Sequence, residues 1–233
     1  MLAHINYLKR KSDFSDFQIV CIPGGFSYGD DLGAGKILSL EIISWLKDGL
    51  KRFIDRGGLM LGICNGFQVL AKTGILPEVD FKQKLTLADN DSGRFEDRWV
   101  YLKIEKSLPA GRQGKLRIEN VWLEGLPEII NLPVAHGEGK FYAEAEILDR
   151  IETSGQVALR YVDEFGKTAG YPFNPNGSLN NIAGITDASR RVLGLMPHPE
   201  RFMFKHHWPF WSKEEVVPFG RKIFENGVKY FKT

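Results

Sequence analysis

Cysteines are scarce in this sequence, and long apolar runs are absent. The two cysteines, Cys21 and Cys64, are too few for a disulfide framework, and neither belongs to a Cys/His cluster with zinc-ligand spacing. No apolar run approaches the roughly 18 to 20 residues that cross a bilayer, and the first residues (MLAHINYLKRK) lack the apolar stretch of a secretion signal. We therefore expect a cytoplasmic protein that has no bound metal and no membrane partner.

Excess charge and nucleotide-binding motifs are also lacking. Lys and Arg total 31 against 29 for Asp and Glu, and no basic block is interleaved with aromatics, which argues against a nucleic-acid partner. Neither G-x-x-x-x-G-K-[ST] nor G-x-G-x-x-G occurs, so we expect no bound nucleotide. What is present is 233 residues with 43% hydrophobic content, enough to form the core of one domain spanning residues 1–233.

The first third of the chain alternates between strand and helix patterns. Residues 18–22 (QIVCI) and 59–63 (LMLGI) are short apolar runs typical of buried strands. Residues 36–56 carry apolar side chains at helical spacing, and residues 67–72 also show a helical pattern. This order predicts an α/β fold with a parallel sheet and crossover helices.

From about Leu85 onward the pattern is mostly β. A stretch at residues 108–115 (LPAGRQGK) is predicted to be an exposed loop, and residues 212–231 are predicted to form a short closing helix or two. The predicted strands in this part are residues 99–104, 116–123, 157–162 and 182–186.

The segment Gly62-Ile63-Cys64-Asn65-Gly66 has the pattern of a nucleophile elbow between a strand and a helix. Glycines are needed there because the sharp turn crowds its neighbours. The helix N-terminus would lower the pKa of the cysteine, and the Asn65 N–H would face a developing oxyanion. The alternative is a buried structural cysteine before an ordinary turn. Cys21, which has no such elbow, is expected to be a core residue.

A general base with an orienting partner is available in His198-Pro199-Glu200, which follows the apolar run at residues 192–196. The alternative for this tripeptide is an ordinary polar loop. Another loop, PGGFSYGD at residues 23–30, follows the first strand, and Gly25 would supply a second oxyanion N–H. Phosphate binding is the competing interpretation of that loop, and the missing nucleotide motifs disfavour it.

These motifs occur in one chain and in a fixed order, and together they resemble a known family. GICNGFQ and MPHPERF are similar to the triad-type (class I) glutamine amidotransferases. PGGFSYGDDLGAGKI, NDSGRFEDRWV, AHGEGKFY and GYPFNPNGSLNNIAGITD narrow the resemblance to the glutaminase subunit of phosphoribosylformylglycinamidine synthase. The resemblance implies a flavodoxin-like α/β fold, in which a mostly parallel central sheet with flanking helices carries additional β-strands.

The resemblance also implies a reaction and a partner. Cys64 would attack the side-chain amide of glutamine and release ammonia, with Gln68 and the backbone around Gly137 holding the substrate. The ammonia would pass to a large ATP-dependent synthetase subunit that makes formylglycinamidine ribonucleotide in de novo purine biosynthesis. ATP and Mg would be used by that partner, and this chain would bind no cofactor. Whether a small third subunit bridges the two stays open.

The resemblance predicts one departure in the fold. Members of the family carry a strand and a helix before the segment matched here by AHINYLKRKSDF, so we expect that strand and helix to be missing, which would leave an exposed sheet edge or a gap beside QIVCI. Three other functions remain possible from the sequence. They are the glutaminase parts of guanylate, cytidylate, carbamoyl-phosphate or anthranilate synthesis, a non-catalytic subunit that stabilises a synthetase, and a thiol hydrolase unrelated to glutamine.

Overall fold

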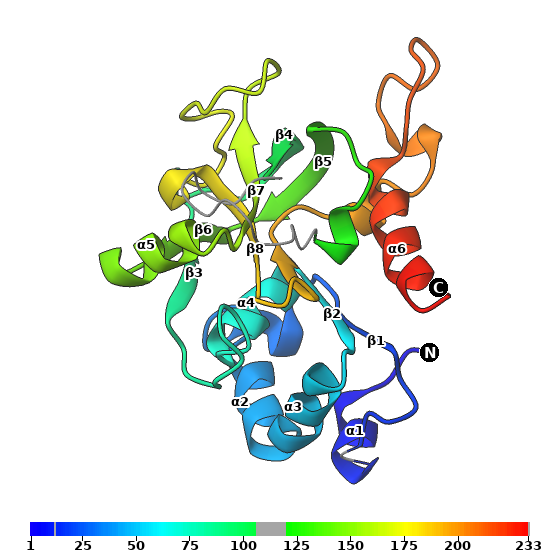
Figure 1. Cartoon of the computed structure of the whole chain (residues 1–233). Helices are drawn as coiled ribbons and strands as arrows, with labels where there is room; N and C mark the ends of the chain where they lie inside the picture. Colours follow the sequence, from blue (N-terminus) through cyan, green and yellow to red (C-terminus); the bar gives the residue numbers. More distant parts are fainter. Residues whose placement is uncertain (12, 106–119, 233) are drawn as a thin grey trace.

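The computed structural model describes residues 1–11, 13–105 and 120–232 (Figure 1). The predicted loop at residues 108–115 therefore lies outside the described residues. In chain order the elements are α1 (Ile5–Lys11), β1 (Ile19–Ile22), η1 (Ser27–Asp30), α2 (Lys36–Trp45), α3 (Lys47–Asp55), β2 (Leu59–Ile63), α4 (Asn65–Lys72), β3 (Leu85–Asp89), β4 (Glu96–Ile104), η2 (Val121–Leu123), β5 (Ile129–His136), β6 (Glu138–Ala143), α5 (Ala145–Thr153), β7 (Val157–Val162), η3 (Leu179–Asn181), β8 (Ile182–Thr186), β9 (Val192–Leu195), η4 (Pro199–Arg201), η5 (Lys205–His207) and α6 (Phe219–Tyr230).

A seven-stranded sheet in the order β1-β2-β9-β8-β7-β4-β5 forms the centre, and β3 pairs with β6 in a separate ribbon. The predicted α/β architecture, with flanking helices and additional strands, is confirmed. The prediction that the sheet is mostly parallel is wrong. Parallel pairing joins β1, β2 and β9, whereas β8, β7, β4 and β5 pair antiparallel. The strands expected as additions extend the same sheet, because antiparallel neighbours need no crossover helix.

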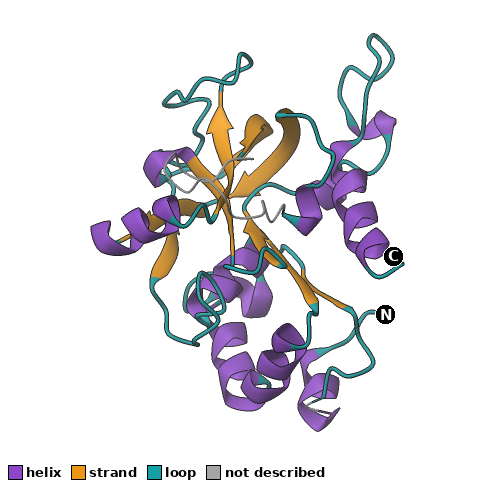
Figure 2. Ribbon diagram, viewed as in Figure 1, coloured by secondary structure: helices purple, strands orange, loops and turns teal. Residues whose placement is uncertain are grey.

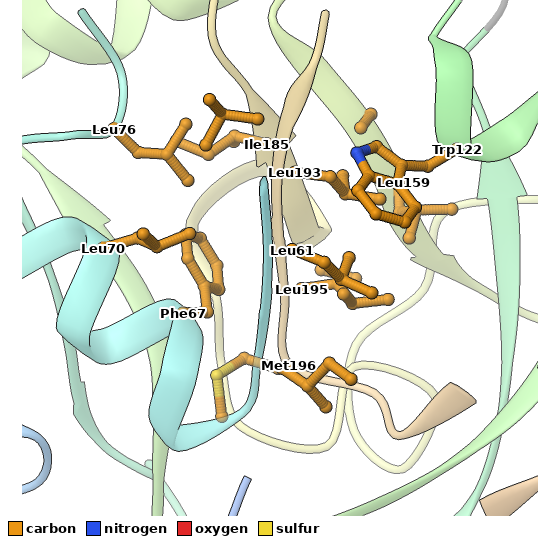
Figure 3. Close-up of a cluster of buried hydrophobic side chains, with 14 of the residues drawn as sticks. Leu61, Phe67, Leu70, Leu76, Trp122, Leu159, Ile185, Leu193, Leu195 and Met196 are labelled. Atoms are coloured by element: carbon orange, nitrogen blue, oxygen red, sulfur yellow. The ribbon is translucent and has the colours of Figure 1, made fainter. Parts of the chain in front are cut away.

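Within the parallel part of the sheet, every residue of β2 and β9 is buried, and Figure 2 shows helices packed beside these strands. Figure 3 shows Phe67 and Leu70 of α4 on one side of the central strands and Trp122 of η2 on the other. Helix α6 packs on η2, where Asn226 Nδ2 donates to the carbonyls of Trp122 (3.0 Å) and Glu124 (2.8 Å). Burial on both faces explains the continuous apolar runs LMLGI and VLGL in β2 and β9.

Most predicted elements are present, with local differences. The helix expected at residues 36–56 is divided at Leu46, whose buried backbone adopts φ −121° and ψ −3° between α2 and α3. The strand expected at residues 116–123 is wrong within its described part. Val121–Leu123 is a 3₁₀ turn, because the Asn120 side chain accepts a hydrogen bond from Trp122 N. Helix α6 begins only at Phe219, directly after Pro218.

Strand β1 lies at one end of the sheet and, among the described residues, pairs with β2 alone. The expected open edge beside QIVCI is therefore observed. Cys21 is exposed on this strand, so the prediction that it belongs to the core is wrong. An edge strand is shielded by neighbours on one side only, and apolar sequence alone does not reveal this position.

The turn from β2 into α4 is packed tightly against β1. A Cβ on Gly66 would lie 2.0 Å from the carbonyl oxygen of Ile22, and one on Gly62 would lie 2.7 Å from the carbonyl oxygen of Gly66. Both obstacles are backbone atoms, which cannot rotate away as a side chain would. The glycines of the elbow therefore permit a contact between backbones that any larger residue would prevent.

We expect Gly66→Ala to lower the free energy of unfolding by about 3 kcal/mol, because overpacking against fixed backbone forces α4 and β1 apart. Gly170→Ala is the matched control, since a Cβ there meets nothing within 4 Å. The control should change stability by less than about 0.5 kcal/mol. Urea denaturation of both variants measures the difference, and equal stabilities would contradict this description of the turn.

Candidate active site

Cys64 occupies the turn itself, between β2 and α4, in a conformation that is rare for a residue with a side chain. Its φ is 50° and its ψ is −107°. The strain is held by hydrogen bonds on both sides, because Cys64 N donates to Leu195 O (2.8 Å) and Cys64 O accepts from Gln68 N (3.1 Å). The thiol is buried and lies 3.8 Å from the carbonyl oxygen of Ala135.

The protonation state of this thiol differs from the expectation. Burial raises the pKa of Cys64 to about 12, and the backbone N–H of Asn65 offsets only part of that rise. The prediction that the helix N-terminus lowers the pKa is wrong, because desolvation of a thiolate at this site outweighs the favourable N–H. The resting thiol is therefore neutral, and it would need a base that removes its proton in order to act as a nucleophile.

A histidine with one unoccupied ring nitrogen lies beside the thiol. His198 Nδ1 is 2.6 Å from Glu200 Oε1, which holds the ring, while His198 Nε2 is buried and has no hydrogen-bond partner among the described residues. A Cβ on Gly24 would lie 2.8 Å from His198 Cε1 and 3.4 Å from Cys64 Cβ, so the bare glycine lets both side chains share one space. His198 N donates to Pro133 O (2.8 Å).

A cavity of about 610 Å³ opens at this point. It brings together most of the residues predicted for the site, whereas Asn65 and Glu200 are not among its lining residues. The predicted residues that line it are Cys64, His198, Gly25, Gln68 and Gly137. Five charged residues that were not predicted for the site also line it, namely Asp30, Asp89, Arg94, Glu138 and Arg201. The sequence could have identified these residues, because each lies within or beside one of the motifs that carry the family resemblance.

The residues predicted to bind substrate differ in how many of their polar groups already have hydrogen-bond partners. The Asn65 side chain donates to Asp30 Oδ1 (3.0 Å) and Gln68 Oε1 (3.2 Å), so only its backbone N–H faces the thiol. Gln68 Nε2 donates to Glu138 O (2.7 Å), which leaves one N–H of that amide unassigned. Gly25 has φ +115° and no atom within 4 Å of a Cβ position, so its backbone is open.

We expect iodoacetamide to alkylate Cys64 slowly at neutral pH, with a rate that rises about tenfold per pH unit between about pH 7 and pH 10. The reason is that the thiolate fraction of a group with pKa about 12 keeps growing through this range. The measurement uses Cys21→Ser, because Cys21 is exposed. A rate that levels off near neutral pH would show a stable thiolate and contradict the burial argument.

Comparison with known proteins places this geometry in a family. The profile of the CobB/CobQ-like glutamine amidotransferase domain matches residues 1–231. Phosphoribosylformylglycinamidine synthase subunit PurQ of Dehalococcoides mccartyi is 44% identical over 234 residues, covering 98% of this chain and 86% of the relative. The subunit of the same name in Methanococcus maripaludis is 40% identical over 248 residues, covering 99% and 87%.

Solved structures agree. The structure of PurLQS from Thermotoga maritima matches with a TM-score of 0.66 and 31% identity, covering 94% of this chain and 82% of that one. A glutamine amidotransferase from the same organism, at 14% identity and a TM-score of 0.50, covers 93% of this chain and 80% of that one and supports the fold alone. By sequence and by structure, this chain belongs to the PurQ family of glutamine amidotransferases.

Proposed function

We propose that this chain is a glutaminase subunit that hydrolyses glutamine and supplies the ammonia to a synthetase in purine biosynthesis. The observation that carries the proposal is the buried Cys64 thiol in a strained turn, in one cavity with the unoccupied Nε2 of His198. The names of the PurQ relatives support the substrate and the pathway.

The first half of the reaction follows from the protonation states. As Cys64 Sγ attacks the carboxamide carbon, its proton moves to His198 Nε2, and Glu200 stabilises the resulting imidazolium. The carbonyl oxygen becomes an oxyanion, which the backbone N–H groups of Asn65 and Gly25 would stabilise. The imidazolium then donates its proton to the leaving amide nitrogen, which departs as ammonia and leaves a glutamyl thioester.

The second half reverses these proton movements. His198 takes a proton from water as the water oxygen attacks the thioester carbon, and it returns a proton to the departing sulfur of Cys64. Glutamate leaves, and the thiol is neutral again. Because the same imidazole serves in both halves, its orientation by Glu200 matters twice.

The substrate is a zwitterion, and the cavity offers charges of both signs. Asp30 and Glu138 are suited to its ammonium group, and Arg94 and Arg201 to its carboxylate. The free N–H of Gln68 and the backbone at Gly137 would complete the contacts.

The partner is assigned by chemistry and by resemblance. Free ammonia is protonated near neutral pH, so a synthetase that uses it gains from docking over the cavity. Phe26 and Phe95 line the cavity and are 70% and 54% exposed, which gives a partner an apolar rim to cover.

We assign ATP and Mg to the large synthetase subunit, place the complex in the cytoplasm, and leave open a small bridging subunit. The name PurLQS of the solved structure supports such an assembly.

Cys64→Ala tests the proposal in the complex with the synthetase. Glutamine-dependent synthesis of the amidine should fall by at least about 10³-fold, since only the nucleophile is lost, while synthesis from added ammonium should stay unchanged. Cys21→Ala is the control and should retain both activities.

Two results would contradict the proposal. Glutamine-dependent synthesis that survives Cys64→Ala would show that the chain is a non-catalytic stabilising subunit. Hydrolysis of unrelated esters or amides with no glutamine-dependent synthesis in the unsubstituted complex would favour a general thiol hydrolase.

A further inference from the structure

The turn between β5 and β6 forms one wall of the cavity, and its backbone is fixed at every carbonyl. Asn90 Nδ2 donates to the carbonyl oxygen of His136 (2.8 Å), and the backbone N–H of Asn90 donates to the carbonyl oxygen of Gly137 (2.9 Å). Gln68 Nε2 donates to Glu138 O (2.7 Å), and Asn176 Nδ2 donates to Gly139 O (2.8 Å). Three amide side chains from distant parts of the chain therefore hold these four residues.

The His136 imidazole connects two of those amides. Its Nδ1 is 3.1 Å from Asn90 Oδ1, and its Nε2 is 3.4 Å from Asn176 Nδ2. The ring is buried against Gly139, where a Cβ would lie 2.5 Å from Nδ1 of the ring. The imidazole therefore has no room to turn over, and each nitrogen keeps one partner.

The partners determine which ring nitrogen carries the proton. Asn90 Nδ2 donates to the carbonyls of Arg94 and His136, both at 2.8 Å, so Asn90 Oδ1 faces the ring and accepts from Nδ1. Asn176 Oδ1 accepts from Ser178 Oγ (2.7 Å) and Ser178 N (3.1 Å), so its Nδ2 faces the ring. One N–H of that amide donates to Gly139 O, and the other is shared by the Tyr161 hydroxyl (3.3 Å) and His136 Nε2 (3.4 Å), so Nε2 is an acceptor. His136 is therefore the neutral Nδ1–H tautomer.

The surroundings favour this neutral form. Burial and the nearby His198 lower the pKa of His136 to about 4. Other titratable groups around the ring are Cys64 and Glu138 in the same cavity and the buried hydroxyl of Tyr161, which lies 3.3 Å from Asn176 Nδ2. A proton on Nε2 would place two donors against each other, which the fixed amides cannot relieve by flipping.

We propose that His136 is a positioning residue. By bridging Asn90 and Asn176 as a neutral donor and acceptor, it fixes the backbone of residues 136–139 where that backbone receives glutamine. This inference rests on the proposed glutaminase function. It assigns His136 to substrate affinity, whereas Cys64, His198 and Glu200 perform the chemical steps.

The test is labelling of Cys64 by a glutamine-analogue chloroketone, in the complex with the synthetase and followed by peptide mass spectrometry. His136→Phe replaces the imidazole by a slightly larger aromatic ring and removes both hydrogen bonds. We expect the half-saturating probe concentration to rise about tenfold or more, and the maximal labelling rate to change less than about threefold. His206→Phe, at an exposed histidine, is the matched control. Iodoacetamide, which needs no glutamine site, should label both variants equally.

Imidazole ¹⁵N NMR of the unsubstituted protein measures the tautomer independently of labelling. His136 should be protonated at Nδ1 and unprotonated at Nε2 near neutral pH. If His136→Phe does not fold, Asn176→Asp serves instead, because its carboxylate accepts from Nε2, and both Nε2 protonation and weaker probe binding are then expected.

The outcomes separate this inference from the proposed function. A folded His136→Phe with unchanged half-saturation, or an Nε2–H tautomer in the unsubstituted protein, overturns the positioning role. Absence of saturable Cys64 labelling in the unsubstituted complex overturns the glutaminase proposal itself.

Discussion

The contact between the first turn of α4 and the end of β1 is the constraint on which the rest of the site depends. Gly66 approaches the carbonyl of Ile22 so closely that no side chain fits between them. This contact holds the turn at Cys64 in its strained conformation, with Cys64 in the lining of the cavity. It also places Gly24 and Gly25, which follow β1, beside the thiol. A single close approach of two backbones therefore fixes the nucleophile and the loop that faces it.

Strand β5 supplies the second set of contacts that position Cys64 and His198. In strand order β5 and β1 lie at opposite ends of the sheet, yet Pro133 O accepts from His198 N and Ala135 O contacts the Cys64 thiol. The sheet must curl for both ends to reach one cavity. The antiparallel strands are thus part of the site, because they return β5 over the ends of β2 and β9. The burial that raises the pKa of Cys64 comes in part from this return.

Features set by neighbouring residues could be predicted from the sequence, and features set by distant contacts could not. The glycine elbow and the His198–Glu200 pair depend on a few adjacent residues, and both geometries are observed. The high pKa of Cys64 depends on β5, far along the chain. The division between α2 and α3 at Leu46 cannot be predicted from the sequence, because the apolar spacing of a helix continues through that residue. Asn90 and Asn176, which hold residues 136–139 together with Gln68, are likewise ordinary asparagines in the sequence until the fold brings them together.

During turnover, Cys64 should carry the acyl group of glutamine. The decisive experiment is rapid acid quenching of the complex during glutamine hydrolysis, followed by peptide mass spectrometry. We expect a glutamyl adduct on the peptide that contains Cys64, and none on the peptide that contains the exposed Cys21. An adduct on Cys21, or glutamate formation with Cys64 unmodified at every quench time, would contradict it.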